Sequence, residues 1–473
     1  MIRRAGRGGW DGWQRSAGTI VVLGIVALVC AWMVTRRAEA QSGEPGERPE
    51  QEVTLSLEFT GQTKLNLLLE EFSAEQGTTK SDADKTRGVV QNDLALTDLF
   101  NLVTVRANLG MAPPADTIGW AAYRPQDGSI FTGISDRGYP NASFVAGGKV
   151  RLNGSDLVLD AWLKEYPSTR DILTRTYRVR PEWYREAAHR FSDDIVLYLT
   201  GIEGISRTRI AFISDASGKK ELYLTDFDGE NVRQITRDKS IALSPAWSAD
   251  GGRVGFVSFR KGDADLYAVN LGSGQITAMV TRPGPEIGPS FSRDGRRLAW
   301  SSTVEGQSEI YSSGPDGASP KRLTTNRAID TAPAWSPTGN EVVFTSDRSG
   351  NPQLYVMDAE GGNVRRLSWQ GNWNDSADWS PDGLRLVYVS RQGGAFKIWS
   401  MLADGGGPVA MTTGAGTDEN PKWAPDGRKI VFSSTRQGRR ALYTMNSDGS
   451  GVRRLTFLDA DCYGTSWGPR LPR

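Results

Sequence analysis

The segment Gly464-Thr465-Ser466-Trp467-Gly468 fits the Gly-x-Ser-x-Gly pattern that surrounds the nucleophile of many serine hydrolases. That chemistry requires a strand, a sharp turn and a helix, followed in the chain by an acid and a histidine. Only five residues follow Gly468, and the single histidine of the chain, His189, precedes the motif. We therefore expect no nucleophilic catalysis at Ser466.

Metal chemistry is also poorly supported. His189 falls within Glu182 to Leu199, a segment with helical periodicity, where a packed or surface role is more common than that of a catalytic base. One histidine and two cysteines cannot assemble a Cys/His zinc cluster. Asp226-Phe227-Asp228-Gly229 begins like a calcium loop but lacks the downstream bidentate glutamate. The sequence predicts a protein that is not an enzyme, with no catalytic residue, cofactor or metal.

The C-terminal half is organised by an aromatic residue that recurs every 44 residues, as in Pro333-Ala334-Trp335-Ser336-Pro337. A repeat of this length that holds several short strands is typical of propellers and similar arrays. Glycines recur between the strands, where tight turns need a positive backbone dihedral. We predict six units of four strands each. The six anchors are Trp247, Phe291, Trp335, Trp379, Trp423 and Trp467.

The repeats are offset at the two ends of the array. The first unit, from Arg209, has no anchor strand of its own, and the last anchor, Trp467, stands alone near the C-terminus. The last strand is therefore predicted to complete the first blade, which closes the ring and removes exposed sheet edges.

An α/β domain is predicted ahead of this all-β six-bladed propeller, over residues 52–203, with the propeller over 204–473. Val53, Leu55, Leu57 and Phe59 alternate as one face of a strand. A helix is expected from a capping box at Ser81 and Asp84 to about Leu99. Further strands are expected at 102–105, 142–152, 157–166 and 172–179, and a second helix from Pro181 to Gly201. Residues 111–140 are rich in glycine and proline, and the sequence does not assign an element to them.

The first 40 residues have the features of an export signal, with four arginines ahead of an apolar run from Ala17 to Val34. Ala38-Glu39-Ala40 offers small residues at the positions that a signal peptidase reads, so cleavage is expected after Ala40. An uncleaved membrane anchor is the alternative. The mature chain would begin with a polar acidic tail over 41–51. It would carry 50 basic and 53 acidic residues and only Cys462. We expect no nucleic-acid partner and no disulfide.

The blade pattern Pro-x-Trp-Ser-Pro-Asp-Gly, followed by an apolar strand, resembles the repeats of the TolB family. The segment Leu199-Thr200-Gly201-Ile202, with Gly204 and Arg207-Thr208-Arg209-Ile210-Ala211 after it, is similar to the junction between the family's α/β domain and its first blade. The resemblance covers nearly the whole mature chain, although the tail over 41–51 adds about ten polar residues ahead of the first strand. Similar blade motifs also occur in some serine peptidases.

The resemblance implies a non-enzymatic periplasmic component of the Tol-Pal system, which supports outer-membrane integrity and cell division. Its propeller would bind the peptidoglycan-associated lipoprotein Pal, and its N-terminal segment would contact the inner-membrane protein TolA. The strand residues Val53, Leu55, Leu57 and Phe59 are candidates for that segment. We expect a monomer. Two other classes stay open: an exported propeller enzyme, such as a lactonase or peptidase fragment, and a generic propeller that binds peptides or glycans.

Partner binding is expected where the six units differ, in the loops that lead into each anchor strand. A carboxylate lies four to six residues before the aromatic anchor in five of the six units, so we hypothesise an acidic collar at the channel mouth. Such a collar would attract a partner that presents Lys or Arg. Two aromatic residues in the same loops could anchor an interface. The candidates are Glu286, Asp330, Trp373, Asp375, Asp418, Glu419, Asp461 and Tyr463.

Overall fold

The computed structural model describes residues 64–103, 142–391 and 394–471, all of which belong to one compact unit that spans 57–473. Its N-terminal part is a six-stranded sheet with the order β3-β1-β4-β5-β6, in which β2 pairs with β4. β1 is parallel to β3 and β4, and the long strands β4, β5 and β6 are antiparallel. The strands are β1 (Leu65–Leu69), β2 (Ser73–Glu75), β3 (Phe100–Val103), β4 (Phe144–Asn153), β5 (Asp156–Glu165) and β6 (Asp171–Val179).

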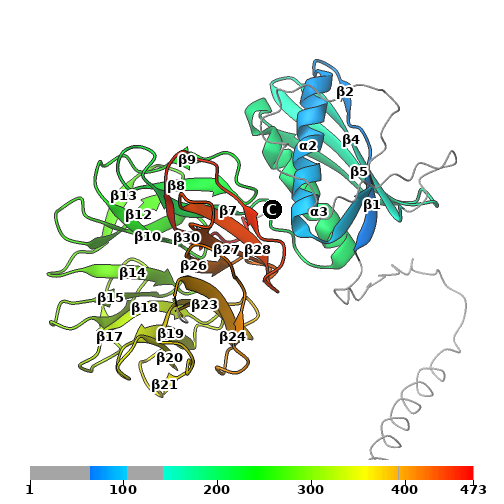
Figure 1. The fold of residues 1–473 in the computed structure, drawn as a ribbon. Helices are drawn as coiled ribbons and strands as arrows, with labels where there is room; N and C mark the ends of the chain where they lie inside the picture. Colours follow the sequence, from blue (N-terminus) through cyan, green and yellow to red (C-terminus); the bar gives the residue numbers. More distant parts are fainter. Residues whose placement is uncertain (1–63, 104–141, 392–393, 472–473) are drawn as a thin grey trace, which may run out of the picture. The chain divides into compact units, whose positions relative to one another are not determined.

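Two helices pack together against this sheet, α2 (Lys80–Thr97) and α3 (Tyr184–Thr200), and their apolar residues form one core with the strands (Figure 1). The capping box that begins α2 consists of Thr79 and Asp82, so the prediction of Ser81 and Asp84 is wrong by two residues. Pro181 opens a short 3₁₀ turn, η2 (Pro181–Trp183), ahead of α3. Gly201 ends α3 in the left-handed conformation, where glycine meets no steric penalty.

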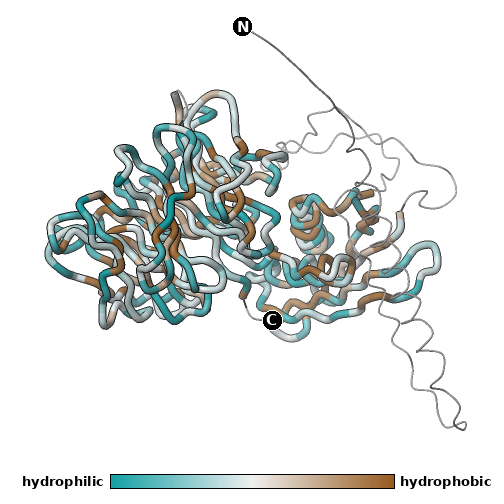
Figure 2. Tube along the Cα trace, turned by 90° about the horizontal axis from the view of Figure 1, so that it is seen from below, coloured by the Kyte–Doolittle hydropathy of each residue, from teal (hydrophilic) through white to brown (hydrophobic). Residues whose placement is uncertain are grey.

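Six four-stranded antiparallel sheets make up the C-terminal part, which confirms the predicted six-bladed propeller. Apolar and polar stretches alternate along the chain throughout the propeller (Figure 2). The innermost strands are β10 (Ala242–Trp247), β14 (Glu286–Phe291), β18 (Asp330–Trp335), β22 (Trp373–Trp379), β26 (Asp418–Trp423) and β30 (Cys462–Trp467). The second strands are β7 (Arg209–Ser214), β11 (Arg253–Ser258), β15 (Leu298–Ser302), β19 (Glu341–Ser346), β23 (Arg385–Arg391) and β27 (Lys429–Ser434).

The outer half of each blade follows the same order. The third strands are β8 (Glu221–Asp226), β12 (Asp265–Asn270), β16 (Glu309–Ser313), β20 (Gln353–Asp358), β24 (Phe396–Leu402) and β28 (Ala441–Asn446). The outermost strands are shorter: β9 (Arg233–Gln234), β13 (Ile276–Val280), β17 (Lys321–Arg322), β21 (Arg365–Arg366), β25 (Val409–Ala410) and β29 (Arg453–Arg454). In five of the six blades an aromatic side chain on the second strand packs against a tyrosine on the third, as in Phe212 with Tyr223.

The C-terminal strand closes the ring, as predicted, because β30 pairs with β7 in a sheet of order β30-β7-β8-β9. The Trp467 indole donates a hydrogen bond to Thr208 Oγ1 at 2.9 Å, and the backbone N–H of Gly468 donates to Arg209 at 2.8 Å. On the other side, the Trp247 indole donates to the carbonyl of Ser466 at 3.1 Å. The closing strand is therefore tied to both of its neighbours.

Every innermost strand carries a β-bulge, which the 44-residue pattern did not predict. The register shifts within each strand, for example between Thr331 and Ala334 in β18. The bulge places one residue in the left-handed region, with a φ of 50° at Ala332 and 53° at Asn420. Bulges bend a strand and increase its twist. Because they recur in all six blades, we assign them to the curvature of the channel wall.

Several predictions lie outside the described residues. These are the export signal, the acidic tail over 41–51 and the strand that carries Val53, Leu55, Leu57 and Phe59. Among the residues that are described, no helix is long and apolar enough to cross a bilayer.

Candidate partner-binding face

The loops that lead into the six innermost strands lie at one end of the blades. Each innermost strand begins at this end and finishes at the turn that follows its aromatic anchor. The third strands finish at that second end too, and there α2 and α3 contact the turn after β8. The loops into the innermost strands therefore lie at the opposite end of the blades from the turn that contacts α2 and α3. We call this end the loop face.

Three of the predicted collar carboxylates, Glu286, Asp330 and Asp418, have no exposed side-chain area. Glu286 accepts hydrogen bonds from Ser302 Oγ at 2.9 Å, Arg282 Nε at 3.2 Å and the Trp300 indole. Burial raises the pKa of the Glu286 carboxyl, and the bonds from Ser302 and the Arg282 charge oppose this rise. A partner in solution cannot reach this group.

Asp330 and Asp418 have similar surroundings. Asp330 is paired with Arg348 at 3.0 Å and accepts a bond from Asn326 at 2.6 Å. Asp418 accepts bonds from Arg436 at 3.1 Å, Lys397 at 3.3 Å and Ser434 at 2.5 Å. These carboxylates tie the first residue of an innermost strand to the end of the second strand of its own blade, and Asp418 is also bound to β24 of the preceding blade through Lys397. This is a structural role.

The other predicted candidates are partly exposed. Asp375 accepts a bond from Thr345 Oγ1 at 2.7 Å, Glu419 pairs with Arg440, and Asp461 accepts from the backbone N–H of Arg440 at 2.9 Å. Tyr463 lies between Lys220, 4.2 Å from its ring, and Asp461, 3.2 Å from its hydroxyl. Trp373 is 39% exposed and packs edge-on against Phe396. The structure therefore brings together a mixed polar cluster around Tyr463, but it does not expose a continuous ring of carboxylates.

Sequence reasoning named Trp373 but missed five other exposed apolar side chains at this end of the blades, four of them in the same loops and one, Ile287, on β14. Ile329 and Trp373 occupy equivalent positions 44 residues apart, and Ile241 occupies the equivalent position two units earlier. Trp369 and Phe457, 72% and 68% exposed, are equivalent to each other. Repetition of large apolar residues immediately ahead of a strand was a signal that could have been found. We call this set the apolar arc: Ile241, Ile287, Ile329, Trp369, Trp373 and Phe457.

A groove of 440 Å³ adjoins the arc where the closed first blade meets the second. It is lined by Ile241, Leu243 and Phe259 on one side and by Asp215 and Lys220 on the other. Exposed apolar groups rimmed by charged ones are typical of protein interaction sites. The loop face can therefore accept an apolar side chain of a partner within a polar rim.

His189 is not exposed: only 4% of its side chain is accessible, and it lies where α3 meets the turn after β8. Its Nδ1 is 2.7 Å from Asp93 Oδ2, and its Nε2 is 3.8 Å from Asp226 Oδ2. Nearby, Arg185 Nη2 donates to Asp228 Oδ2 at 2.6 Å. Atoms of Asp93, His189 and Asp228 are close enough together to hold a metal ion. The positive charge that these carboxylates require is already supplied by Arg185 and the His189 imidazolium, so we interpret the group as an ion-pair cluster.

This cluster predicts a pH-dependent stability. Burial opposes protonation of the imidazole, but the charge of Asp93, its hydrogen bond to Nδ1 and the nearby Asp226 carboxylate outweigh this effect and raise the pKa of His189 to about 10. Because the pKa of His189 is higher in the folded than in the unfolded chain, its protonation stabilises the fold. This stabilisation is complete below the unfolded pKa of about 6.5 and is lost as pH rises through the pKa of the folded state. The thermal midpoint should therefore fall between pH 7 and 10. In His189→Gln this fall should be shallower, whereas Arg190→Gln, on the same helix, should follow the parent. Parallel pH profiles for His189→Gln and the parent would contradict the assignment.

The serine of the Gly-x-Ser-x-Gly pattern lies within the closing strand β30 and not on a strand-to-helix turn. Ser466 Oγ accepts from the backbone N–H of Trp247 at 3.3 Å. The only histidine of the chain is held in the ion-pair cluster at α3. The pattern is thus part of the sixth anchor, as the repeat indicated.

Six blades closed by the C-terminal strand, with an α/β sheet and two helices ahead of them, define a six-bladed β-propeller protein with an N-terminal α/β region. Residues 197–471 match the family described as the TolB β-propeller domain, which is more than half of the chain. The chain therefore belongs to the TolB β-propeller family.

Related proteins carry the same family name. The chain is 35% identical over 199 residues to "Protein TolB homolog" of Chlorobium chlorochromatii, covering 42% of each chain. It is 42% identical over 110 residues to "Tol-Pal system protein TolB" of Desulfosudis oleivorans, covering 23% of this chain and 25% of that one. The matches thus span less than half the length of these relatives. The crystal structure of TolB from Acinetobacter baumannii shares the fold, with a TM-score of 0.70 at 24% identity, over 86% of this chain and 98% of that chain.

Proposed function

We propose that the protein is a non-enzymatic adaptor of the Tol-Pal system, located in the periplasm after cleavage of its export signal. Its propeller binds the peptidoglycan-associated lipoprotein through the loop face, and its N-terminal segment contacts TolA. Through these contacts it supports outer-membrane integrity and constriction at cell division. We place the boundary between the two domains at residues 203 and 204. Membership of the TolB propeller family and the relatives named for the Tol-Pal system support this proposal.

The observation that carries the binding role is the apolar arc on the loop face. Trp369 and Phe457 are more than two-thirds exposed, although burial of such large apolar side chains would be favourable. The cation of Arg366 lies 4.5 Å from the ring of Trp369, and that of Arg454 lies 5.2 Å from the ring of Phe457. Exposed Trp, Phe and Arg together are enriched at protein interfaces. The polar cluster of Asp461, Tyr463 and Lys220 would then form part of the rim.

Substitution of an arc residue should weaken lipoprotein binding. Trp373→Ala should reduce the affinity for the soluble domain of the lipoprotein about tenfold or more, because buried aromatic anchors dominate interface energies. Titration calorimetry with the purified domain measures this effect. Leu384→Ala is the matched control, since Leu384 is 65% exposed on the turn after β22, at the end of the blade away from the loop face. Equal affinities for both variants and the parent would contradict binding through the arc.

A further inference from the structure

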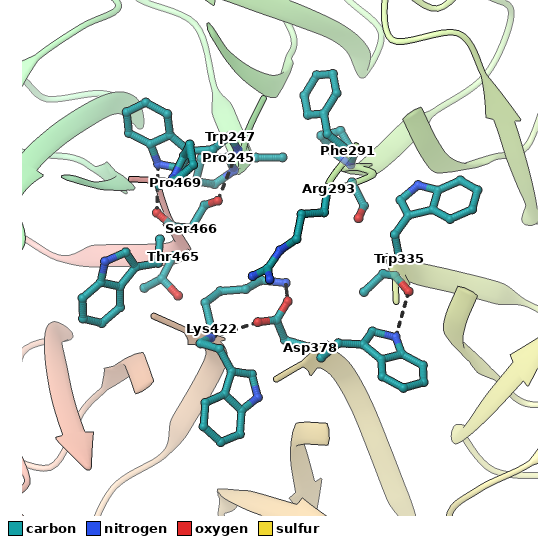
Figure 3. A pocket seen from close by; sticks show the side chains of 18 of the residues that line it. Pro245, Trp247, Phe291, Arg293, Trp335, Asp378, Lys422, Thr465, Ser466 and Pro469 are labelled. Atoms are coloured by element: carbon teal, nitrogen blue, oxygen red, sulfur yellow. Dashed lines mark hydrogen bonds and ion pairs between the residues drawn. The ribbon is translucent and has the colours of Figure 1, made fainter. Parts of the chain in front are cut away.

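A cavity of 500 Å³ lies at the centre of the propeller, between the innermost strands (Figure 3). Its wall runs from the β-bulges to the aromatic anchors and the turns that follow them, and it includes residues from all six blades. The arc residues of the loop face are not among those that line it. A volume of this size is within the range of small-molecule sites, roughly 300–1,000 Å³.

Charged side chains in this cavity are not repeated from blade to blade. Arg293, Asp378 and Lys422 point toward one another in the middle of the channel, and each comes from a different blade (Figure 3). The equivalents of Arg293 in the other blades are Ala249 and four prolines, at 337, 381, 425 and 469. By the logic that repeated residues build the scaffold, these three unrepeated residues are candidates for a specific function.

The carboxylate of Asp378 is already occupied. Its Oδ1 is 3.2 Å from Lys422 Nζ, and its Oδ2 accepts the backbone N–H of Trp423 at 2.9 Å. Arg293 Nη1 donates to the carbonyl of Pro381 at 3.2 Å, and no carboxylate of the described residues lies within ion-pair distance of its guanidinium. At the cavity rim, Arg470 has its own partner in Glu203 at 3.6 Å. The centre of the cavity therefore holds two cations and one carboxylate.

This balance leaves an unmatched positive charge in a confined space. Burial lowers the pKa of Arg293, with Asp378 opposing and Arg470 adding to the effect. An arginine nevertheless stays protonated at neutral pH, and its planar fork of donors matches carboxylate and phosphate groups. An ammonium group next to it offers a further charged donor to the same anion.

We propose that the central cavity binds a small anion with carboxylate or phosphate groups, held between Arg293 and Lys422. Arg293 follows β14 and Lys422 lies on β26, so the two residues come from blades on opposite sides of the ring. A bound anion links these blades across the channel and stabilises the closed ring. This site is separate from the loop face and does not depend on the proposed function.

The test is ligand-induced stabilisation of the full mature chain at constant ionic strength. Inorganic phosphate and succinate are added separately, with sodium chloride as the ionic control, and the thermal midpoint is recorded. At one hundred times the dissociation constant the midpoint should rise by roughly 3–5 °C, in a saturable manner. A response to succinate alone identifies a carboxylate site, and a response to phosphate alone identifies a phosphate site.

Variants then assign the response to the cavity. Arg293→Gln and Lys422→Gln should each raise the apparent dissociation constant at least tenfold, and Arg293→Lys should retain part of the binding. Arg296→Gln, on the same turn but outside the cavity, should respond like the parent. Each shift is measured against the variant's own ligand-free midpoint, so a less stable variant still reports on binding. The proposal is overturned if neither anion acts saturably, if Arg293→Gln keeps the full response, or if calcium chloride stabilises the chain and the anions do not.

Discussion

Removal of the residues after Ala460 should destabilise the entire propeller and not merely its last strand. The deletion takes away β30 and thereby exposes the edge of β7, which in the intact chain pairs with β30 from Cys462 to Trp467. It also removes the hydrogen-bond acceptor of the Trp247 indole in the neighbouring blade. Because an open ring presents unpaired strand edges, we expect loss of cooperative thermal unfolding and a tendency to aggregate.

A single substitution tests the same closure with less disruption. Trp467 is 9% exposed and packs with Ile210, Phe212 and Leu455. Trp467→Ala should therefore cost about 3–5 kcal/mol of unfolding free energy, which lowers the thermal midpoint by roughly 5–9 °C. Trp369→Ala removes the same side chain from an exposed position and should change the midpoint little. If the truncated chain and Trp467→Ala both unfold at the parental temperature, the ring is not closed by this strand.

Charge reversal at Glu286 or Asp330 should strongly destabilise the fold, whether or not a partner is present. In Glu286→Lys an ammonium group would replace a carboxylate beside Arg282, and in Asp330→Lys beside Arg348, where the native side chains are fully buried. Removal of one partner from a buried pair costs about 3–5 kcal/mol, a large share of the roughly 5–15 kcal/mol that holds a typical domain folded. Denaturation by urea, followed by tryptophan fluorescence, measures the loss.

The control for both variants is Asp459→Lys, because the Asp459 side chain is fully exposed on a loop of the same face. Its unfolding free energy should remain within about 0.5 kcal/mol of the parent. The acidic-collar hypothesis makes the opposite prediction for Glu286→Lys and Asp330→Lys, namely parental stability with weaker partner binding at low salt. That result would show that Glu286 and Asp330 act as surface groups, and it would contradict their structural role.

The architecture of the propeller was predictable because its evidence is periodic. An aromatic anchor that recurs every 44 residues indicates both the number of blades and the unpaired strand at the C-terminus. Local signals were less decisive. Thr79 with Asp82 and Ser81 with Asp84 fit the same capping-box pattern two residues apart, and only the backbone conformation at Thr79 selects between them. The bulges were missed because the residues with positive φ are of different types, as Ser244, Ala332 and Asn420 show. No single residue type marks this position in all the repeats.

The candidate site was only partly predictable, since burial depends on residues that are distant in sequence. Nothing in the loop around Asp330 shows that Arg348 will cover its carboxylate. One available signal was overlooked: Glu286, Asp330 and Asp418 are separated by multiples of 44 residues, so they occupy one repeated position. Residues that recur at equivalent positions of the repeats have structural roles, and this rule predicts a structural role for these carboxylates as well as for the aromatic anchors. Of the apolar arc only Trp373 was named from the sequence, and the charges of the central cavity became apparent only when side-chain direction was known.

Hydrogen exchange of the propeller, measured with and without the soluble domain of the peptidoglycan-associated lipoprotein, tests the central claim most directly. We predict slower exchange in the loops that enter β10, β18 and β22, around Ile241, Ile329 and Trp373. The turns at the other end of the blades, such as that of Leu384, should exchange at an unchanged rate. Protection confined to those turns, or no protection at saturating concentrations of the lipoprotein domain, would contradict an adaptor that binds through its loop face.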